Sequence, residues 1–428
     1  MKRYIYKQLL AWKNEKEHKP LILNGARQVG KTYILREFGR NEYKRMAFFS
    51  LDRDQKALEI FNKGGRATDM LMALSAICHE DITPHDTLVV LDEIQNCPKA
   101  LEALKFFCEE TPEIDIVVAG SLLGLSIHSG VSYPVGKVEE LHLYPMTFLE
   151  FLEAMGKTQL VNLLENKNWT VINMLETELI SSLRQYYYVG GMPAAVLAHI
   201  EKKGWKEVRR IQQQIITDYR RDFSKHAPTR EIPRINMVWD SIPAQLAKEN
   251  KKFVYGAVKK SARAADFEIA IQWLIDAGLA YKVPRVNAPR LPLKFYEDIS
   301  AFKLFMLDVG LMGAMAETTA ESVVVGDNIF SEYKGAFTEL YVFTQLKALG
   351  YSLYYHAVDN STIEIDFLTQ RDNQVIPIEV KAEVNVKAKS LRTFISNNPE
   401  LKGIRFSMLP YKEQDWMTNI PLYACMAW

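Results

Sequence analysis

The sequence has few cysteines, almost no net charge and no long uninterrupted apolar run. Its four cysteines form no C-x-x-C pair and lie near no histidine at ligand spacing, which argues against a disulfide framework or a zinc site and favours a reducing compartment. No window approaches the roughly 18 uninterrupted apolar residues of a membrane span, and residues 1–20 lack the apolar stretch of a signal peptide. We therefore expect a cytoplasmic protein without a membrane partner.

The size and composition predict a globular protein of more than one domain. The chain has 428 residues, and its 48% of hydrophobic residues, 21 glycines and 17 prolines exclude a disordered or collagen-like chain. Lys and Arg number 53 against 52 Asp and Glu, a net charge of +1 that at first argues against a nucleic-acid partner. A neutral total can nevertheless conceal segments of opposite charge.

Short apolar runs alternate with helical patterns in the first 145 residues, as in a parallel sheet covered by helices. The predicted strands are Leu21–Asn24, Met46–Leu51, Thr87–Leu91, Ile114–Ala119 and Val138–Leu143. The pattern is helical from Pro145 to about Ala227. Further along, a helix is expected at Ser331–Leu349, followed by strands at Ser352–His356, Thr362–Thr369 and Val375–Ala382.

A phosphate-binding loop follows the first predicted strand. The motif G-x-x-x-x-G-K-[ST] is formed by Gly25, Ala26, Arg27, Gln28, Val29, Gly30, Lys31 and Thr32. The glycines let backbone N–H groups point inward at phosphate oxygens, and the start of the following helix adds positive potential. We expect Lys31 to neutralise the β- and γ-phosphates and the Thr32 hydroxyl to ligate Mg²⁺.

Two adjacent carboxylates end a second apolar strand. Asp92 and Glu93 follow Leu88–Leu91, in the order and context that ATP hydrolysis requires. Asp92 is expected to hold the Mg²⁺ shell, and Glu93 to orient and deprotonate the attacking water. Read alone, the pattern also fits a buried strand capped by two solvated acids, but the two motifs together predict ATP and Mg²⁺ as cofactors.

Ser121 follows the next predicted strand and is a candidate sensor of the γ-phosphate. A strand between the phosphate loop and the acidic strand, with Glu after Asp, resembles the additional-strand ATPases. In that class a polar residue near the γ-phosphate ends the strand after the acidic one. A Gly-Ser pair after a strand is equally an ordinary turn, so both readings stay open.

Five segments together resemble one family. They are Gly25–Thr32, Leu88–Gln95, Ala119–Ser121, Leu143–Met146 and Gly190–Pro193. Over nearly its full length the chain resembles bacterial and archaeal AAA-type ATPases with a C-terminal DUF4143 domain. The resemblance implies an α/β fold: a P-loop NTPase (AAA-like) parallel sheet at 1–145, a helical lid at 146–229, a winged-helix module at 230–298, and a C-terminal α/β domain like a restriction endonuclease at 299–428.

Pro193 is a further candidate that rests on this resemblance. Gly191, Met192 and Pro193 look like the G-x-P element of signal-transduction ATPases, where the proline packs near the adenine. A turn that begins a helix explains the same residues. No arginine finger can be assigned, and a homo-oligomer is a candidate assembly only.

The middle of the chain is basic. Residues 201–263 contain 16 Lys and Arg against 7 Asp and Glu, a net charge of +9, and the remainder carries −8. Predicted helices follow in winged-helix order, and Gly278–Val283 would begin the wing. The third helix, at Ala264–Ala277, contains three acidic residues and is a poor reader of a DNA groove. DNA contacted without sequence preference is therefore a candidate partner, and a solvated lysine-rich surface is the alternative.

The C-terminal part contains an acid on a strand followed by E-x-K on the next. Asp366, Glu379 and Lys381 would lie together on a hairpin, with Glu339 from the preceding helix. The order resembles the PD-(D/E)XK nucleases. The resemblance implies Mg²⁺ bound by Asp366 and Glu379, completed by Glu339, and water positioned or activated by Lys381. A half-exposed hairpin with cross-strand ion pairs has the same pattern.

Two functional hypotheses remain. In the first, the ATP cycle controls a DNA-acting, nuclease-like C-terminal domain. In the second, the chain is a nucleotide-dependent switch or protein-interaction scaffold in which the C-terminal acids are structural. The biological process and the protein partners are not readable from these residues.

Overall fold

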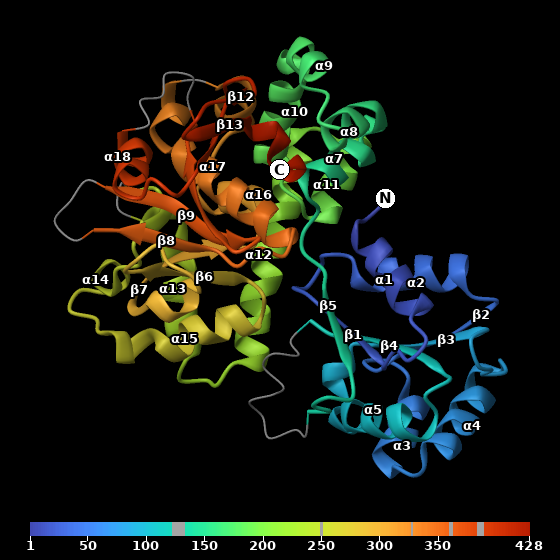
Figure 1. Ribbon diagram of the computed structural model, residues 1–428. Helices are drawn as coiled ribbons and strands as arrows, with labels where there is room; N and C mark the ends of the chain where they lie inside the picture. Colours follow the sequence, from blue (N-terminus) through green and yellow to red (C-terminus); the bar gives the residue numbers. More distant parts are fainter. Residues whose placement is uncertain (122–132, 249–250, 327, 359–362, 383–388) are drawn as a thin grey trace. The chain divides into compact units, whose positions relative to one another are not determined.

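The computed structural model describes residues 1–121, 133–248, 251–326, 328–358, 363–382 and 389–428. Contacts divide the chain into two units (Figure 1). The N-terminal unit comprises Lys2–Tyr144 with Asp276–Leu279, and the C-terminal unit comprises Pro145–Ile275 and Ala280–Trp428, together with Met1. The four-part division expected from the sequence remains a prediction. Within the described ranges, none of the helices combines the length and the apolar character that a membrane crossing requires.

The N-terminal unit is a parallel sheet between two layers of helices. Its strands are β1 (Leu21–Asn24), β2 (Arg45–Ser50), β3 (Thr87–Asp92), β4 (Asp115–Ala119) and β5 (Glu139–His142). They lie in the order β2-β3-β4-β1-β5, and every recorded pairing is parallel. All five predicted strands are confirmed, with ends shifted by at most one residue. Because β4 lies between β1 and β3, the residues after these three strands meet at one edge.

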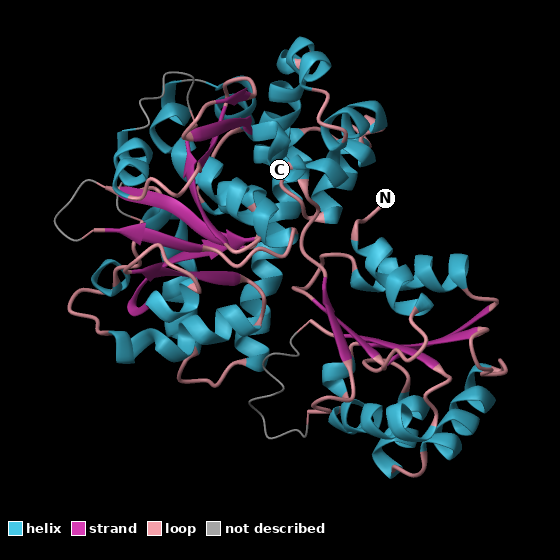
Figure 2. Ribbon diagram, in the orientation of Figure 1, coloured by secondary structure: helices cyan, strands magenta, loops and turns pink. Residues whose placement is uncertain are grey.

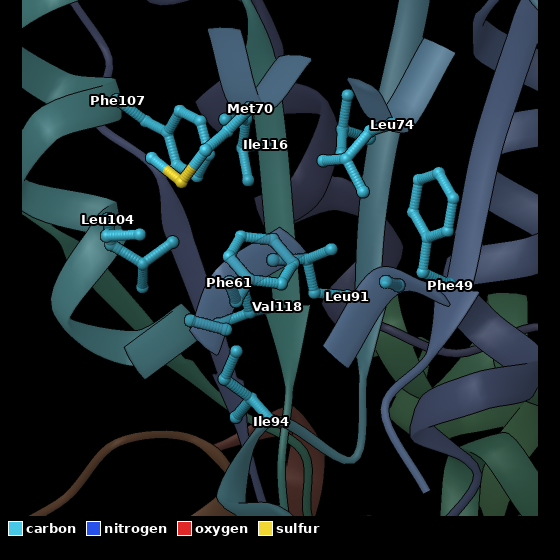
Figure 3. Close-up of a cluster of buried hydrophobic side chains, with 14 of the residues drawn as sticks. Phe49, Phe61, Met70, Leu74, Leu91, Ile94, Leu104, Phe107, Ile116 and Val118 are labelled. Carbon is cyan, nitrogen blue, oxygen red and sulfur yellow. The ribbon is translucent and has the colours of Figure 1, made fainter. Parts of the chain in front are cut away.

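Helices cover both faces of this sheet (Figures 1 and 2). They are α1 (Ile5–Asn14) and α2 (Lys31–Glu42) on one face, and α3 (Gln55–Lys63), α4 (Ala67–Cys78) and α5 (Pro98–Glu110) on the other. Side chains from β2, β3 and β4 pack against the second group, where Phe49, Leu91, Ile116 and Val118 meet Phe61 and Phe107 (Figure 3). Strands buried on both faces read as continuous apolar runs, which is why the sequence predicted them well.

The first part of the C-terminal unit is helical, as predicted. From Pro145 to Ile275 the described residues form helices and no strand. The helices are α7 (Phe148–Ala154), α8 (Thr158–Glu165), α9 (Trp169–Met174), α10 (Glu176–Val189), α11 (Pro193–Ile200), α12 (Trp205–His226), α13 (Ile232–Leu246), α14 (Tyr255–Val258) and α15 (Ala264–Asp276). The three predicted helices of the winged module correspond to α13, α14 and α15, with α14 reduced to a single turn.

The second part is a mixed sheet. Its strands lie in the order β12-β13-β11-β10-β9-β8-β6-β7. They are β6 (Ala280–Val286), β7 (Glu297–Met306), β8 (Tyr354–Ala357), β9 (Glu364–Arg371), β10 (Gln374–Val380), β11 (Gly403–Ser407), β12 (Lys412–Glu413) and β13 (Met417–Pro421). The helices of this part are α16 (Val309–Met315), α17 (Asn328–Ala348) and α18 (Lys389–Asn397).

The predicted wing is therefore part of a larger sheet. Strand β6 pairs antiparallel with β7, as a wing would, and also contacts β8. The expected boundary at residue 299 falls inside β7. The predicted helix and three strands after residue 330 correspond to α17, β8, β9 and β10, and Thr362 lies outside the described residues. The winged-helix and nuclease-like assignments themselves stay predictions.

A buried aspartate joins three segments of the C-terminal unit. Asp308 precedes α16, is 1% exposed, and accepts hydrogen bonds from Gly191 N (2.6 Å) and Leu311 N (2.9 Å). Gly191 O in turn accepts from Met146 N at 2.7 Å, and a Cβ on Gly191 would lie 2.1 Å from Met146 O. This close approach explains why the Gly190-Gly191 pair precedes α11.

We predict that Asp308→Ala lowers the free energy of unfolding of the C-terminal unit by about 3 kcal/mol, because it leaves buried N–H groups unpaired. Asp308→Asn, which keeps one acceptor oxygen, should lose about half as much. Urea unfolding followed by tryptophan fluorescence measures both. Equal stability of Asp308→Ala and wild type would contradict the role given to this carboxylate.

Candidate nucleotide site and C-terminal charge cluster

The phosphate loop of the N-terminal unit connects β1 to α2. Gly25 has φ +150°, and a Cβ there would lie 2.4 Å from Leu143 O, so only glycine fits beside the residue that follows β5. Gly30 directly precedes α2 and lies in the left-handed region, at φ 99°. These two glycines allow the sharp turn that the motif predicted. Ala26 and Val29 between them are buried, at 2% and 0% exposed.

Lys31 lies inside this loop. Its Nζ donates hydrogen bonds to Gly25 O and Ala26 O, each at 2.8 Å, and the side chain is buried. Burial lowers the pKa of Lys31 to about 8, against the opposing charges of Glu93 and Asp92. An ammonium group held by two carbonyl oxygens in a buried loop is poised to exchange them for phosphate oxygens.

Thr32 and Asp92 meet at the end of the central strands. Thr32 Oγ1 donates to Asp92 Oδ2 at 2.7 Å, and Glu93 N donates to Asp92 Oδ1 at 3.1 Å. Burial raises the pKa of Asp92, and the Thr32 hydrogen bond opposes that shift. The structure thus brings together the hydroxyl and the carboxylate that the sequence predicted as Mg²⁺ ligands, and both offer the hard oxygen donors that Mg²⁺ prefers.

Glu93 and Ser121 follow neighbouring strands. Glu93 has φ 55° and directly precedes the short helix η1 (Ile94–Asn96), and its Oε2 accepts a hydrogen bond from Gln95 Nε2. Ser121 follows β4 and is 4% exposed, and its Oγ has no hydrogen-bond partner among the described residues. A buried hydroxyl normally has a partner, and the sensor role of Ser121 stays a prediction beside the turn interpretation.

Two residues that support this site were not found from the sequence. Arg3 is buried and donates from Nη1 to Val29 O (2.9 Å) and from Nη2 to Tyr144 O (2.6 Å), so it joins the phosphate loop to the end of the unit. Gln95 was named only as the last residue of the segment Leu88–Gln95, with no role predicted for it. Arg27 and Gln28 lie in the loop as predicted, and Gln28 adopts φ 65°.

Pro193 belongs to the other unit. It is the first residue of α11, where the fixed φ of proline suits a helix start. The preceding glycines contact Met146 and Asp308 closely. The turn interpretation accounts for this segment, and adenine contact by Pro193 stays a prediction.

The four predicted residues of the C-terminal constellation gather in one cluster of the C-terminal unit. Val380 N donates to Asp366 Oδ2 at 2.7 Å, and Lys381 Nζ lies 3.2 Å from Glu379 Oε1. Asp366 also interacts electrostatically with Glu339 and Lys381. Burial raises the pKa values of Asp366 and Glu379.

Two lysines that the sequence analysis did not predict share this cluster. Lys303 Nζ lies 2.9 Å from Glu339 Oε1 and 2.7 Å from Glu364 Oε1, and Lys251 pairs with Glu339 Oε2. In the part of the chain that the structure describes, no group of three or more His, Cys, Asp or Glu side chains is arranged to hold a metal ion. The Mg²⁺ site predicted for Glu339, Asp366 and Glu379 stays a prediction.

Several arginines of the basic middle segment are paired within the protein. Arg210 bonds Glu207, Arg220 bonds Asp240, and Arg221 bonds Asp218. Arg209 donates to the carbonyl oxygens of Gly310 and Thr318. DNA contacted by this segment stays a prediction.

Three segments match known protein families. Residues 17–152 match a family described as an AAA domain, residues 180–322 match a domain of unknown function (DUF8612), and residues 334–424 match a domain of unknown function (DUF4143). The AAA and DUF4143 parts of the expected resemblance are thereby confirmed. The AAA domain supports ATP binding and hydrolysis by the N-terminal unit. Among curated proteins no match was found.

Solved structures resemble the chain only weakly. The Walker-type ATPase Paby2304 of Pyrococcus abyssi is 12% identical, with 74% of this chain and 95% of that chain covered and a TM-score of 0.46. Cdc6p from Pyrobaculum aerophilum is 12% identical, with 76% and 96% covered and a TM-score of 0.26. Drosophila ORC bound to DNA is 15% identical, with 73% and 94% covered and a TM-score of 0.24. Similarity at this level says nothing about substrates or partners.

We predict that binding of ATP takes up a proton at pH 8. Because the pKa of Lys31 is lowered to about 8, about half of these side chains are neutral at that pH, and the phosphates should restore the charge. Calorimetry in buffers of different ionisation enthalpy should show uptake of about half a proton, and affinity should fall as the pH rises above 8. Lys31→Met should remove the uptake, and no uptake by wild type would contradict the prediction.

Proposed function

We propose that the N-terminal unit binds ATP with Mg²⁺ and hydrolyses it. The observation that carries this proposal is the 2.7 Å hydrogen bond between Thr32 and Asp92, beside the loop that encloses Lys31. A hydroxyl and a carboxylate together form a donor set that suits Mg²⁺, and burial of Asp92 favours a cationic partner. Thr32 and Asp92 would hold Mg²⁺, which would supply charge neutralisation for the phosphates.

The other residues of the site would bind the phosphates, accept the proton of the attacking water and contact the γ-phosphate. Lys31 would bind the β- and γ-phosphates together with the inward-pointing N–H groups of the loop formed by Gly25–Thr32. Glu93 would accept the proton of the attacking water, since its carboxylate follows directly after Asp92. The unpartnered Ser121 hydroxyl would contact the γ-phosphate, and its hydrogen bond would be lost on hydrolysis. Adenine contact by Pro193 and assembly into a homo-oligomer belong to the same proposal.

The nucleotide cycle could have either of two consequences, called here the DNA-acting form and the switch form of the proposal. In one, ATP turnover controls a DNA-acting C-terminal domain. In the other, nucleotide occupancy switches a surface for protein contacts and the nuclease-like part is inactive. The pairing of Glu339 with Lys251 and Lys303, and the internal pairing of the basic segment, favour the second form.

We predict that Glu93→Gln lowers the ATP turnover number by about 10²- to 10⁴-fold while the dissociation constant for ATP changes little, because only proton transfer is removed. Steady-state turnover and fluorescent-nucleotide binding measure the two effects. Lys31→Ala is the matched control and should weaken binding itself. Binding of ATP by Lys31→Ala as tightly as by wild type would refute the assignment of the phosphate loop.

Turnover with and without DNA separates the two forms of the proposal. The switch form predicts the same ATP turnover in both conditions. Stimulation by DNA that disappears in Glu93→Gln would favour the DNA-acting form instead. Plasmid and linear DNA should remain intact in the presence of Mg²⁺ or Mn²⁺ if the second form is right.

A further inference from the structure

The C-terminal charge cluster is built around a fully buried lysine. Lys303 lies on β7 within the apolar run Ala301–Met306, and its side chain is 0% exposed. Its ammonium group contacts one oxygen of Glu339 at 2.9 Å and one oxygen of Glu364 at 2.7 Å. Two carboxylates from different elements, α17 and β9, thus converge on a single nitrogen.

Three further carboxylate oxygens of the cluster also have partners. The second oxygen of Glu339 pairs with Lys251, one oxygen of Asp366 accepts the N–H of Val380, and one oxygen of Glu379 pairs with Lys381. Glu379 Oε2 is buried without a partner among the described residues. A divalent cation needs several oxygen ligands, and five oxygens of these four carboxylates are already paired with a lysine or an N–H group.

Lys303 is enclosed within the cluster. Its ammonium group contacts oxygens of Glu339 and Glu364 inside the protein, where separating these ion pairs would leave buried charges uncompensated. The side chains of Lys251 and Lys381 are 16% and 37% exposed and can turn toward solvent, whereas that of Lys303 is 0% exposed. A divalent ion at this position would meet a fixed positive charge at short range.

We propose that Lys303 is the resident cation of this cluster and takes the position that a divalent metal ion would need. The cluster is then a closed set of ion pairs that joins β7, β9 and α17, and it binds neither Mg²⁺ nor Mn²⁺ in the native chain. Replacing the ammonium group with a small side chain should turn the cluster into a divalent-cation site.

The test counts bound Mn²⁺ by electron paramagnetic resonance in the full-length chain without nucleotide. All variants carry Asp92→Asn, which removes the metal ligand of the ATPase site. In the chain that retains Lys303, the amount of bound Mn²⁺ should be the same with and without Glu339→Gln. Lys303→Ser should bind one additional Mn²⁺ per chain, at least about tenfold more tightly than any Mn²⁺ bound at this cluster by the chain that retains Lys303. Adding Glu339→Gln to this variant should remove the additional ion.

Three results would overturn the proposal. They are Mn²⁺ bound by the chain that retains Lys303 and lost with Glu339→Gln, cleavage of DNA that requires Glu379, and a folded Lys303→Ser variant that gains no ion. If Lys303→Ser fails to fold, the chain that retains Lys303 still decides the question, since bound Mn²⁺ refutes the proposal and its absence supports it. None of these results depends on ATP hydrolysis.

A different observation concerns Gln95 in the N-terminal unit. Its Nε2 donates to Glu93 Oε2, while its Oε1 is buried and has no partner among the described residues. A buried unpaired oxygen costs about 1–3 kcal/mol, so this amide is not explained by packing alone. The left-handed backbone of Glu93 and the turn of η1 bring the two side chains together.

We infer that Gln95 is a positioning residue that holds the Glu93 carboxylate in the direction needed for proton transfer. This inference rests on the proposed ATP hydrolysis. Gln95→Leu keeps the volume but removes the hydrogen bond, and it should lower kcat by about 10- to 100-fold with KM for ATP within about twofold. Gln95→Asn should recover part of the loss if its shorter amide still reaches Glu93.

Wild type and Gln95→Leu together separate the two claims. No ATP hydrolysis by wild type would refute the proposed function. Hydrolysis by wild type with an unchanged kcat in Gln95→Leu would refute only the role of Gln95, as would a loss that appears in KM and not in kcat.

Discussion

A charge taken out of water must be compensated where it lies, and this requirement determines both sites of the protein. In the N-terminal unit, Lys31 is held by the carbonyl oxygens of its own loop, and Asp92 by a hydroxyl and an N–H group. These partners can be replaced by phosphate and a metal ion. In the C-terminal unit, Glu339 is held by two ammonium groups, one of them on a side chain that is 0% exposed. That compensation is permanent, and the two sites therefore differ in what they can bind.

The N-terminal unit was predictable because its signals are local. The strand before the phosphate loop, the loop and the acidic strand are each contained in a few consecutive residues, and parallel topology brings their ends together. Leu21–Asn24 was predicted to the residue, since a strand buried on both faces is a continuous apolar run. The DUF4143 match confirms the last part of the family resemblance, while its nuclease-like character stays a prediction.

The remaining features depend on contacts between distant residues. Lys303 lies 36 residues before Glu339, and Arg3 lies 141 residues before Tyr144. The sequence does contain one usable signal, since a single lysine in the apolar run Ala301–Met306 must find buried acids. The alternation around Asp366 and Glu379 predicted which acids gather, but it could not reveal which cations join them. The charge count of residues 201–263 could not reveal which arginines pair within the protein, and the DNA partner that it suggested stays a prediction.

The most direct measurement counts Mn²⁺ ions on the wild-type chain with a non-hydrolysable ATP analogue. The account predicts one ion per chain, bound only together with the nucleotide and lost with Asp92→Asn. Two ions per chain, with the second independent of nucleotide and lost with Glu339→Gln, would show that the C-terminal cluster is a metal site. That result would contradict the account.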